Sequence, residues 1–270
     1  MMLTTDEVHQ ITAHNTAVWN RCAPTYADVF EPLTGAATTV LLDLASVGRT
    51  TALLDIGTGP GTLIGPALDR GANVAAIDLS PDMVAAARSR YPVVDVTIGD
   101  ATRLPYGDHS YDAVTLGFCL HHAAEPTAIL REANRVLRPG GRLALAVWGP
   151  TEQLEAFGVA FAAIAEAIPT DQPDVPQPPP LGTTPSDYEN LLTQNGFVRP
   201  TARVLELAWP LADGASIFDG FDRFLDLANQ PADIRAQIRR SLDAHICPRV
   251  GADGLAHLAN PAIVAAATKA

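Results

Sequence analysis

Three glycines at alternate positions, directly after an apolar segment, constrain this chain most. The stretch is Leu53-Leu54-Asp55-Ile56-Gly57-Thr58-Gly59-Pro60-Gly61, and a helical pattern follows from about Thr62. Glycine has no Cβ and adopts positive φ readily, so such a turn lets the backbone approach a bound ligand closely. The first amides of the following helix face the same space. The pattern therefore predicts a strand, a turn and a helix with a nucleotide-like site at the turn.

The spacing of the glycines argues against two common kinds of nucleotide site. A dinucleotide fingerprint has glycine at its first, third and sixth positions. Counted from Gly57, the sixth position is Thr62, so a nicotinamide-dependent oxidoreductase is disfavoured. The Gly-Lys-Ser/Thr ending of a P-loop is also missing. What remains is Gly-x-Gly-x-Gly after a strand that carries Asp55.

Short β-rich segments alternate with helical ones between residues 52 and 149. We expect strands at 52–56, 74–77, 93–98, 113–116 and 143–148, and helices at 63–70, 81–90 and 127–137. Ser80 and Pro81 are a typical helix start, and Arg138-Pro139-Gly140-Gly141 predicts a helix stop and a tight turn. This alternation predicts an α/β fold with a parallel, doubly wound sheet. Ligands of such sheets bind beyond the carboxyl ends of the strands.

Helices dominate on both sides of this core. Residues 1–45 have a 3.6-residue apolar period until Pro24 breaks it. The proline-rich stretch 169–185 is interpreted as an extended linker or lid. Around it we expect helices at 154–168 and 186–195, a strand at 197–207, and two helices within 214–247 separated at Pro231. The apolar segment 263–267 is compatible with a strand, although its alanines leave the assignment open.

These motifs resemble those of class I S-adenosylmethionine-dependent methyltransferases, in particular the small-molecule type of ubiquinone and menaquinone biosynthesis. The glycine turn is similar to the first motif of the family. Leu104-Pro105-Tyr106 with Tyr111-Asp112 resembles its "LPF…FD" segment, and Leu137 to Leu143 its "L(K/R)PGG" motif. The resemblance is dense over residues 50–149, and beyond 150 only the general layout matches.

The resemblance implies a fold and a division of the chain. The fold is a doubly wound, seven-stranded, mostly parallel sheet with a helical cap. The expected parts are an N-terminal helical cover (1–45), an S-adenosylmethionine-binding core (46–150), a cap or lid insertion with a late core strand near 197–207 (151–250), and a C-terminal helix or strand that completes the sheet (251–270).

The resemblance also implies cofactor contacts at the ends of successive strands. Asp78 matches the carboxylate that binds the ribose hydroxyls, because a carboxylate can accept two hydrogen bonds from a diol. Its alternative role is to cap the next helix, which Ser80 does better. Asp100 and Ala101 match the adenine-recognition motif, although Asp100 could also be a turn residue.

The other cofactor candidates surround the glycine turn. Asp55 is expected to hold the turn and the methionine amine. Leu79 and Met83 would form apolar walls for the adenine ring, or else belong to the core face of their helix. Tyr26 would close over the cofactor, or pack in the core at helical spacing from Trp19. The turn itself contributes Gly57, Thr58, Gly59 and Gly61.

His121 and His122 follow the fourth expected strand, on the side where the family places its acceptor. Imidazole titrates near neutrality, so either histidine is a candidate general base for a hydroxyl, an amine or an enolisable carbon. Alternatively, the pair caps the strand and only packs. The neighbouring Cys119 is interpreted as a small buried filler.

Charge and composition set the remaining expectations. The net charge of −12 disfavours a nucleic-acid partner. Three distant cysteines suit a reducing cytoplasm and form no metal-ligand spacing. No signal peptide or membrane span is apparent. We expect a cytoplasmic monomer or homodimer.

The expected activity is transfer of a methyl group from S-adenosylmethionine to the O, N or C atom of a small apolar or aromatic metabolite, for example in secondary metabolism. The alternatives are an S-adenosylmethionine-binding enzyme that does not methylate, such as a cyclase, and a cofactor-binding regulatory protein.

Overall fold

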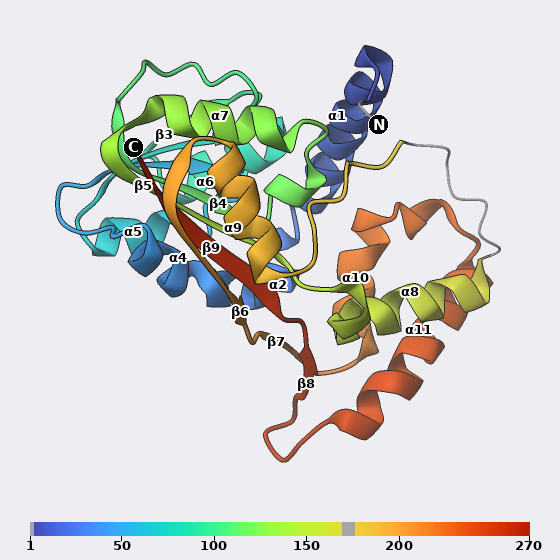
Figure 1. Ribbon diagram of the computed structural model, residues 1–270. Coiled ribbons are helices and arrows are strands. Elements are labelled where there is room, and N and C mark those ends of the chain that lie inside the picture. Colours follow the sequence, from blue (N-terminus) through green and yellow to red (C-terminus); the bar gives the residue numbers. More distant parts are fainter. Residues whose placement is uncertain (1–2, 169–175) are drawn as a thin grey trace.

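A seven-stranded sheet forms the centre of the computed structural model, which describes residues 3–168 and 176–270 (Figure 1). The strand order is β3-β2-β1-β4-β5-β9-β6. The strands are β1 (Ala52–Ile56), β2 (Asn73–Asp78), β3 (Asp95–Ile98), β4 (Tyr111–Gly117), β5 (Leu137–Trp148), β6 (Phe197–Leu205) and β9 (Ala262–Lys269). β1 to β5 are parallel, whereas β9 runs antiparallel to both of its neighbours, β5 and β6. The predicted α/β fold class with a seven-stranded, mostly parallel sheet is confirmed.

Helices cover both faces of this sheet. They are α4 (Thr38–Leu44), α5 (Ile64–Asp69), α6 (Pro81–Arg90), α7 (Pro126–Val136) and α9 (Pro185–Gln194). α7 and α9 share one apolar core with residues such as Leu54 and Val114. α5 and α6 pack on the other face, against Ala76 and Val96. Because side chains alternate along a strand, Ile77 belongs to the first core and its neighbour Ala76 to the second. The sheet is therefore doubly wound.

The segment 263–267, which the sequence left open, is an inner strand of the sheet. Six consecutive residues of β9, from Ala262 to Ala267, are buried. α9 packs against this strand, and so does α4. A strand covered on both faces is continuously apolar rather than alternating, which explains why the pattern of β9 was ambiguous.

The N-terminal segment is helical, as predicted, and its long helix α1 (Thr5–Cys22) lies across α6 and α10 (Gly214–Phe224). α1 begins with a capping box between Thr4 and Glu7. It is followed by α2 (Tyr26–Val29), α3 (Glu31–Thr34) and the short 3-10 helix η1 (Gly35–Ala37).

The cap is built from α8 (Glu155–Ala167), α10 and α11 (Ala232–Ile246), which lie together beside the sheet (Figure 1). The predicted break between two helices at Pro231 is confirmed. The short 3-10 helices of this part are η3 (Thr151–Gln153), η4 (Leu227–Asn229) and η5 (Cys247–Arg249), and η2 (Leu120–His122) follows β4 in the core. Part of the proline-rich stretch, residues 169–175, lies outside the described residues. None of the described helices combines the length and apolar character that crossing a membrane requires.

A second, two-stranded sheet connects the cap to the core, and the sequence analysis missed it. β7 (Ala208–Leu211) pairs antiparallel with β8 (Ala256–Ala259). Trp209 in β7 is almost fully buried, and its indole Nε1 donates a hydrogen bond to the carbonyl oxygen of Val29 at 3.1 Å. Each of these strands has four residues, which is too short for a period-2 pattern to stand out.

The expected turn at residues 138–141 is a bulge inside β5. Tyr111 pairs with Leu137, and the next paired residues are Ala113 and Arg142, so four residues of β5 lie opposite Asp112. A Cβ on Gly141 would lie 2.8 Å from the carbonyl oxygen of Arg138. The glycine is required because the chain folds back on itself here.

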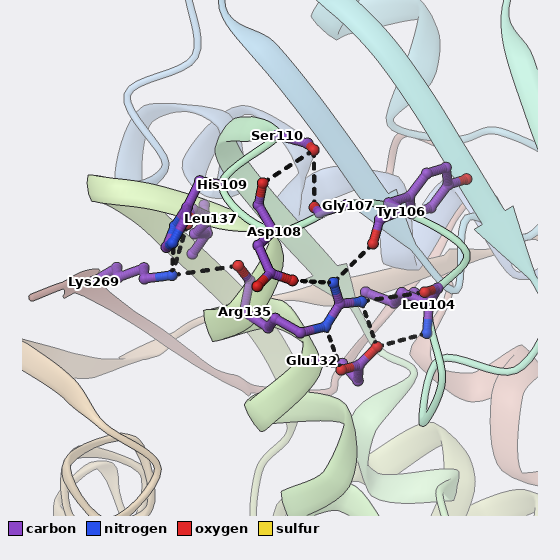
Figure 2. A network of polar contacts seen from close by, with 10 residues as sticks. All are labelled: Leu104, Tyr106, Gly107, Asp108, His109, Ser110, Glu132, Arg135, Leu137 and Lys269. Carbon is purple, nitrogen blue, oxygen red and sulfur yellow. Dashed lines mark hydrogen bonds and ion pairs between the residues drawn. The ribbon is translucent and has the colours of Figure 1, made fainter.

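A polar network fixes the loop before β4 to the end of α7 (Figure 2). The guanidinium of Arg135 donates to both carboxylate oxygens of Glu132, to Asp108 and to the carbonyl oxygens of Tyr106 and Leu104. Glu132 also accepts from the backbone amide of Leu104 at 2.7 Å. In β9, Lys269 donates to the carbonyl oxygen of Leu137 at 2.8 Å. The network joins a loop, a helix and two strands.

Candidate cofactor and acceptor site

A pocket of about 1000 Å³ opens at the carboxyl ends of β1, β2 and β4, beneath α1. A smaller one of about 400 Å³ adjoins it. Both pockets are lined by Tyr26, Gly57, Gly59, Gly117 and Phe118. This is the edge at which ligands bind in open α/β sheets.

The three glycines of the turn have different surroundings. All three have positive φ. A Cβ on Gly57 would lie 2.5 Å from the Cβ of Cys119, so Gly57 permits close contact with the loop after β4. A Cβ on Gly61 would overlap the ring of Tyr91, and Gly61 lines neither pocket. A Cβ on Gly59 would meet nothing within 4 Å, because it would enter the open pocket.

Asp78 and Asp100 lie at the ends of β2 and β3, and both line the larger pocket. The carboxylate of Asp78 accepts from the amide of Gly59 at 2.7 Å and from that of Ser80 at 2.9 Å. Burial raises the pKa of this carboxyl. Asp100 accepts from the amide of Thr102 at 2.8 Å. Asp78 thus ties the glycine turn to the end of the neighbouring strand.

The helix after β2 and the loop after β3 contribute the other predicted residues of the larger pocket. Leu79, Met83 and Ala101 line its wall. Met83 is almost completely buried, so it also belongs to the core. Its amide donates to Ser80 Oγ, which makes Ser80 the cap of α6, as the sequence predicts.

Asp55, Thr58 and Tyr26 line the smaller pocket. Thr115 Oγ1 donates to Asp55 Oδ1 at 2.8 Å, and burial raises the pKa of Asp55 to about 6. The hydroxyl of Thr62, which also lines this pocket, is buried without a hydrogen-bond partner among the described residues. Tyr26 lies between the two pockets and packs edge-on against Trp19. Unpaired buried polar groups are costly, so this pocket suits a polar ligand.

The two histidines differ in position. Their rings are 4.1 Å apart between centroids. His122 lines the larger pocket, where burial lowers its pKa to about 4 and keeps the imidazole neutral at neutral pH. His121 lines neither pocket, and both of its ring nitrogens are buried without partners among the described residues.

α1 contributes pocket residues that sequence reasoning missed. Val8, Thr12 and Asn15 line the larger pocket together with Trp19. Asn15 Nδ2 donates to the carbonyl oxygen of His122 at 2.6 Å. The available signal was that Asn15, a polar residue, lies on the same helix face as the apolar Ile11 and Val18.

Sequence comparison matches residues 54–145 to a family described as "Methyltransferase domain". Two similar proteins are named demethylmenaquinone methyltransferase. That of Paenarthrobacter aurescens is 40% identical over 107 residues, which are 40% of this chain and 42% of the relative. That of Renibacterium salmoninarum is 44% identical over 94 residues, which are 35% of this chain and 40% of the relative. The chain therefore spans less than half the length of these relatives.

Solved structures share the fold over most of the chain. YcgJ of Bacillus subtilis has a TM-score of 0.57 at 20% identity, covering 87% of this chain and 98% of its own. The [4+2]-cyclase SpnF has a TM-score of 0.51 at 21% identity, with 87% and 81% covered. The Haemonchus contortus phosphoethanolamine N-methyltransferase 2, solved with S-adenosyl-L-methionine, has a TM-score of 0.54 at 19% identity. The match covers 87% of this chain and 52% of that structure's chain. Residues 54–145 are therefore similar to a methyltransferase domain, and the chain shares the fold of these solved structures.

Proposed function

We propose that the chain binds S-adenosylmethionine across the two adjoining pockets and transfers its methyl group to a small apolar or aromatic molecule. The observation that carries this proposal is the position of Asp78. Its carboxylate lies at a strand end, is fixed by two backbone amides and faces the larger pocket beside Gly59. A carboxylate held in this way can accept the hydroxyls of a ribose.

Each end of the proposed cofactor site has its own chemistry. Asp100 and Ala101 would bind the adenine, with Leu79 and Met83 as apolar walls. Asp55, Thr58 and Tyr26 would bind the methionine end, because all three line the smaller pocket. Gly57 and Gly59 would let the backbone approach the ligand, and Gly61 would shape the turn against Tyr91.

The acceptor side is supported by the apolar lining of the larger pocket. Val8, Trp19, Phe118 and Ile129 form these walls, and His122 lies among them. The sulfonium makes the methyl group electrophilic, so the residues of the chain align the acceptor and exclude water. His122, neutral at neutral pH, would receive a proton if the acceptor loses one. His121, which lies outside the pocket, would orient the ring of His122 by packing.

The proposal extends to the parts of the chain and to their setting. Residues 1–45 would act as the cover, 46–150 as the cofactor core, 151–250 as the cap and 251–270 as the segment that completes the sheet. Three free cysteines among the described residues suit a reducing, cytoplasmic environment. A monomer or homodimer without a nucleic-acid partner agrees with the net charge of −12.

Two measurements test the proposal in sequence. S-adenosylhomocysteine should bind with 1:1 stoichiometry in isothermal titration calorimetry, and absence of binding would refute the cofactor site. The protein should then transfer the label from methyl-labelled S-adenosylmethionine to a small molecule in a metabolite extract. A product that forms without transferred label would favour the cyclase alternative. Cofactor binding with no product in any extract would favour a regulatory protein.

A further inference from the structure

Asn15 contributes a fixed hydrogen-bond acceptor to the acceptor side of the larger pocket. Its Nδ2 donates to the carbonyl oxygen of His122 at 2.6 Å. A carbonyl oxygen can only accept, so the amide nitrogen of Asn15 must face it, and Oδ1 forms the other end of the side chain. Within the described residues, no group donates to this Oδ1, and Asn15 lines the pocket.

Two other residues of the pocket lining, Thr12 and Glu125, also carry acceptor atoms. Thr12 lies one helical turn before Asn15, and its hydroxyl proton is used in a 2.8 Å hydrogen bond to the carbonyl oxygen of Val8. Thr12 Oγ1 can therefore only accept further bonds. Glu125 lines the pocket just before α7, and its side chain makes no capping bond to that helix. Asn15 and Thr12 thus call for a donor on the ligand, whereas Glu125 is exposed and adds negative charge at the rim of the pocket.

The charge of the lining excludes another class of ligand. The pocket contains the carboxylates of Asp78, Asp100 and Glu125, and none of its described lining residues is lysine or arginine. An anionic acceptor would lose its hydration, and no cationic side chain of the described lining would replace it.

We infer that the acceptor presents a hydroxyl or N–H group to Asn15 Oδ1 and carries no negative charge, and that Asn15 is the positioning residue for that group. This inference rests on the proposed function and deepens it. Asn15 would set the orientation of the acceptor rather than bind the cofactor, since it belongs to α1 and its side chain is hydrogen-bonded to the loop after β4.

Three matched probes test the inference on protein saturated with S-adenosylhomocysteine. 2-Naphthol carries a hydroxyl, 2-methoxynaphthalene lacks the donor, and 2-naphthoate is anionic at neutral pH. We expect 2-naphthol to bind about tenfold more tightly than the methyl ether, which is the value of one well-placed hydrogen bond. 2-Naphthoate should bind more weakly than both, as measured by ligand-observed NMR titration.

Variants identify the residue responsible. Asn15→Leu should reduce the preference for 2-naphthol over its methyl ether to about twofold or less while the affinity for S-adenosylhomocysteine stays unchanged. Asn134→Leu is the matched control, because Asn134 Nδ2 also donates to a backbone carbonyl, that of Gly196, away from the pocket. Thr12→Val provides a second test, with a partial loss of the preference, if Asn15→Leu does not fold.

The outcomes separate this inference from the proposed function. No binding of S-adenosylhomocysteine contradicts the proposed function itself. If that ligand binds, the inference is overturned by equal affinity for 2-naphthol and its methyl ether, by tighter binding of 2-naphthoate, or by no binding of 2-naphthol. A preference that survives Asn15→Leu and Thr12→Val also overturns it.

Discussion

At the scale of single residues, the glycine turn shows that one motif can meet several different requirements. Gly57 makes room for Cys119, Gly61 makes room for Tyr91, and only Gly59 leaves its missing side chain as open space in the pocket. Gly59→Val should therefore fill ligand space. We expect the affinity for S-adenosylhomocysteine to fall by on the order of 100-fold or more, measured by calorimetry.

Gly140→Val is the control for backbone strain. Gly140 also has positive φ and open space at its Cβ position, but it lies outside the pocket. Both variants should lose stability from the unfavourable φ, and only Gly59→Val should lose binding. An equal loss of affinity in the two variants would mean that strain, not occupied space, explains the result.

Asp55 gives a pH-dependent prediction. Burial raises its pKa to about 6 in the folded protein, above the usual 3.8. The folded state therefore binds this proton more tightly than the unfolded state, so Asp55 costs stability as the pH rises from about 4 to about 6. We expect Asp55→Asn to be more stable than the wild type at pH 7, by up to about 3 kcal/mol, and equal to it below pH 4.

Chemical denaturation of both proteins from pH 4 to pH 7 measures this difference in the free energy of unfolding. Carboxylates that titrate in the same way in both proteins contribute equally to both values, so they do not affect the difference. A difference that does not change with pH would contradict the raised pKa. Asp55→Asn should at the same time bind S-adenosylhomocysteine more weakly at pH 7, because the methionine end has an ammonium group that a carboxylate attracts.

The sequence predicted pocket residues where they follow strands. Asp78, Asp100 and His122 were identified because the carboxyl ends of parallel strands meet at one edge of a sheet. Asn15 and Thr12 were missed, since nothing in the pattern of α1 states where that helix docks. His121 and Gly61 were predicted as site residues because they belong to the same motifs as their neighbours. In the structure neither lines the larger pocket, and Gly61 packs against Tyr91.

At the scale of elements, the network around Arg135 connects α7 with the loop before β4 (Figure 2). Arg135→Met would leave Glu132 and two backbone carbonyls with fewer partners. We expect the free energy of unfolding to fall by about 1–3 kcal/mol. Amide hydrogen exchange should become faster in residues 104–110.

Arg249→Met is the matched control for this prediction. Arg249 pairs with Glu155 at 3.4 Å on the surface, where the two side chains are 42% and 47% exposed. Such a pair contributes at most about 1 kcal/mol. A loss at Arg135 that is no larger than the loss at Arg249 would show that the network does not fix the loop.

At the scale of the whole molecule, the family resemblance implied that residues 251–270 complete the sheet, but the residue pattern did not predict the insertion of β9 between β5 and β6. Alternating strands and helices predict the parallel part, β1 to β5, because three of its four connections carry a helix (α5, α6 and α7), while a loop joins β3 to β4. The sequence of β9 shows no alternation of apolar and polar residues, because the strand is buried on both faces and is rich in alanine. Its position is set by long-range pairing with β5 and β6.

This packing predicts that β9 cannot accept larger side chains. Ala265 in β9 is fully buried. We expect Ala265→Leu to destabilise the fold by about 1–3 kcal/mol through overpacking. Thermal or denaturant unfolding checks this against Ala232→Leu, at an exposed position of α11. Equal stability of the two variants would mean that the space around β9 is not filled.

The strand order also bears on how the protein is made. β9 is translated after residues 149–261, yet its place is beside β5. Until β9 has been synthesised, the outer edge of β5 has backbone N–H and C=O groups without hydrogen-bond partners. β6 also lacks β9, the strand with which it pairs in the folded protein. Such edges are templates for pairing with other chains. We therefore expect the yield of folded protein to depend on chaperones and on the speed of translation over this interval.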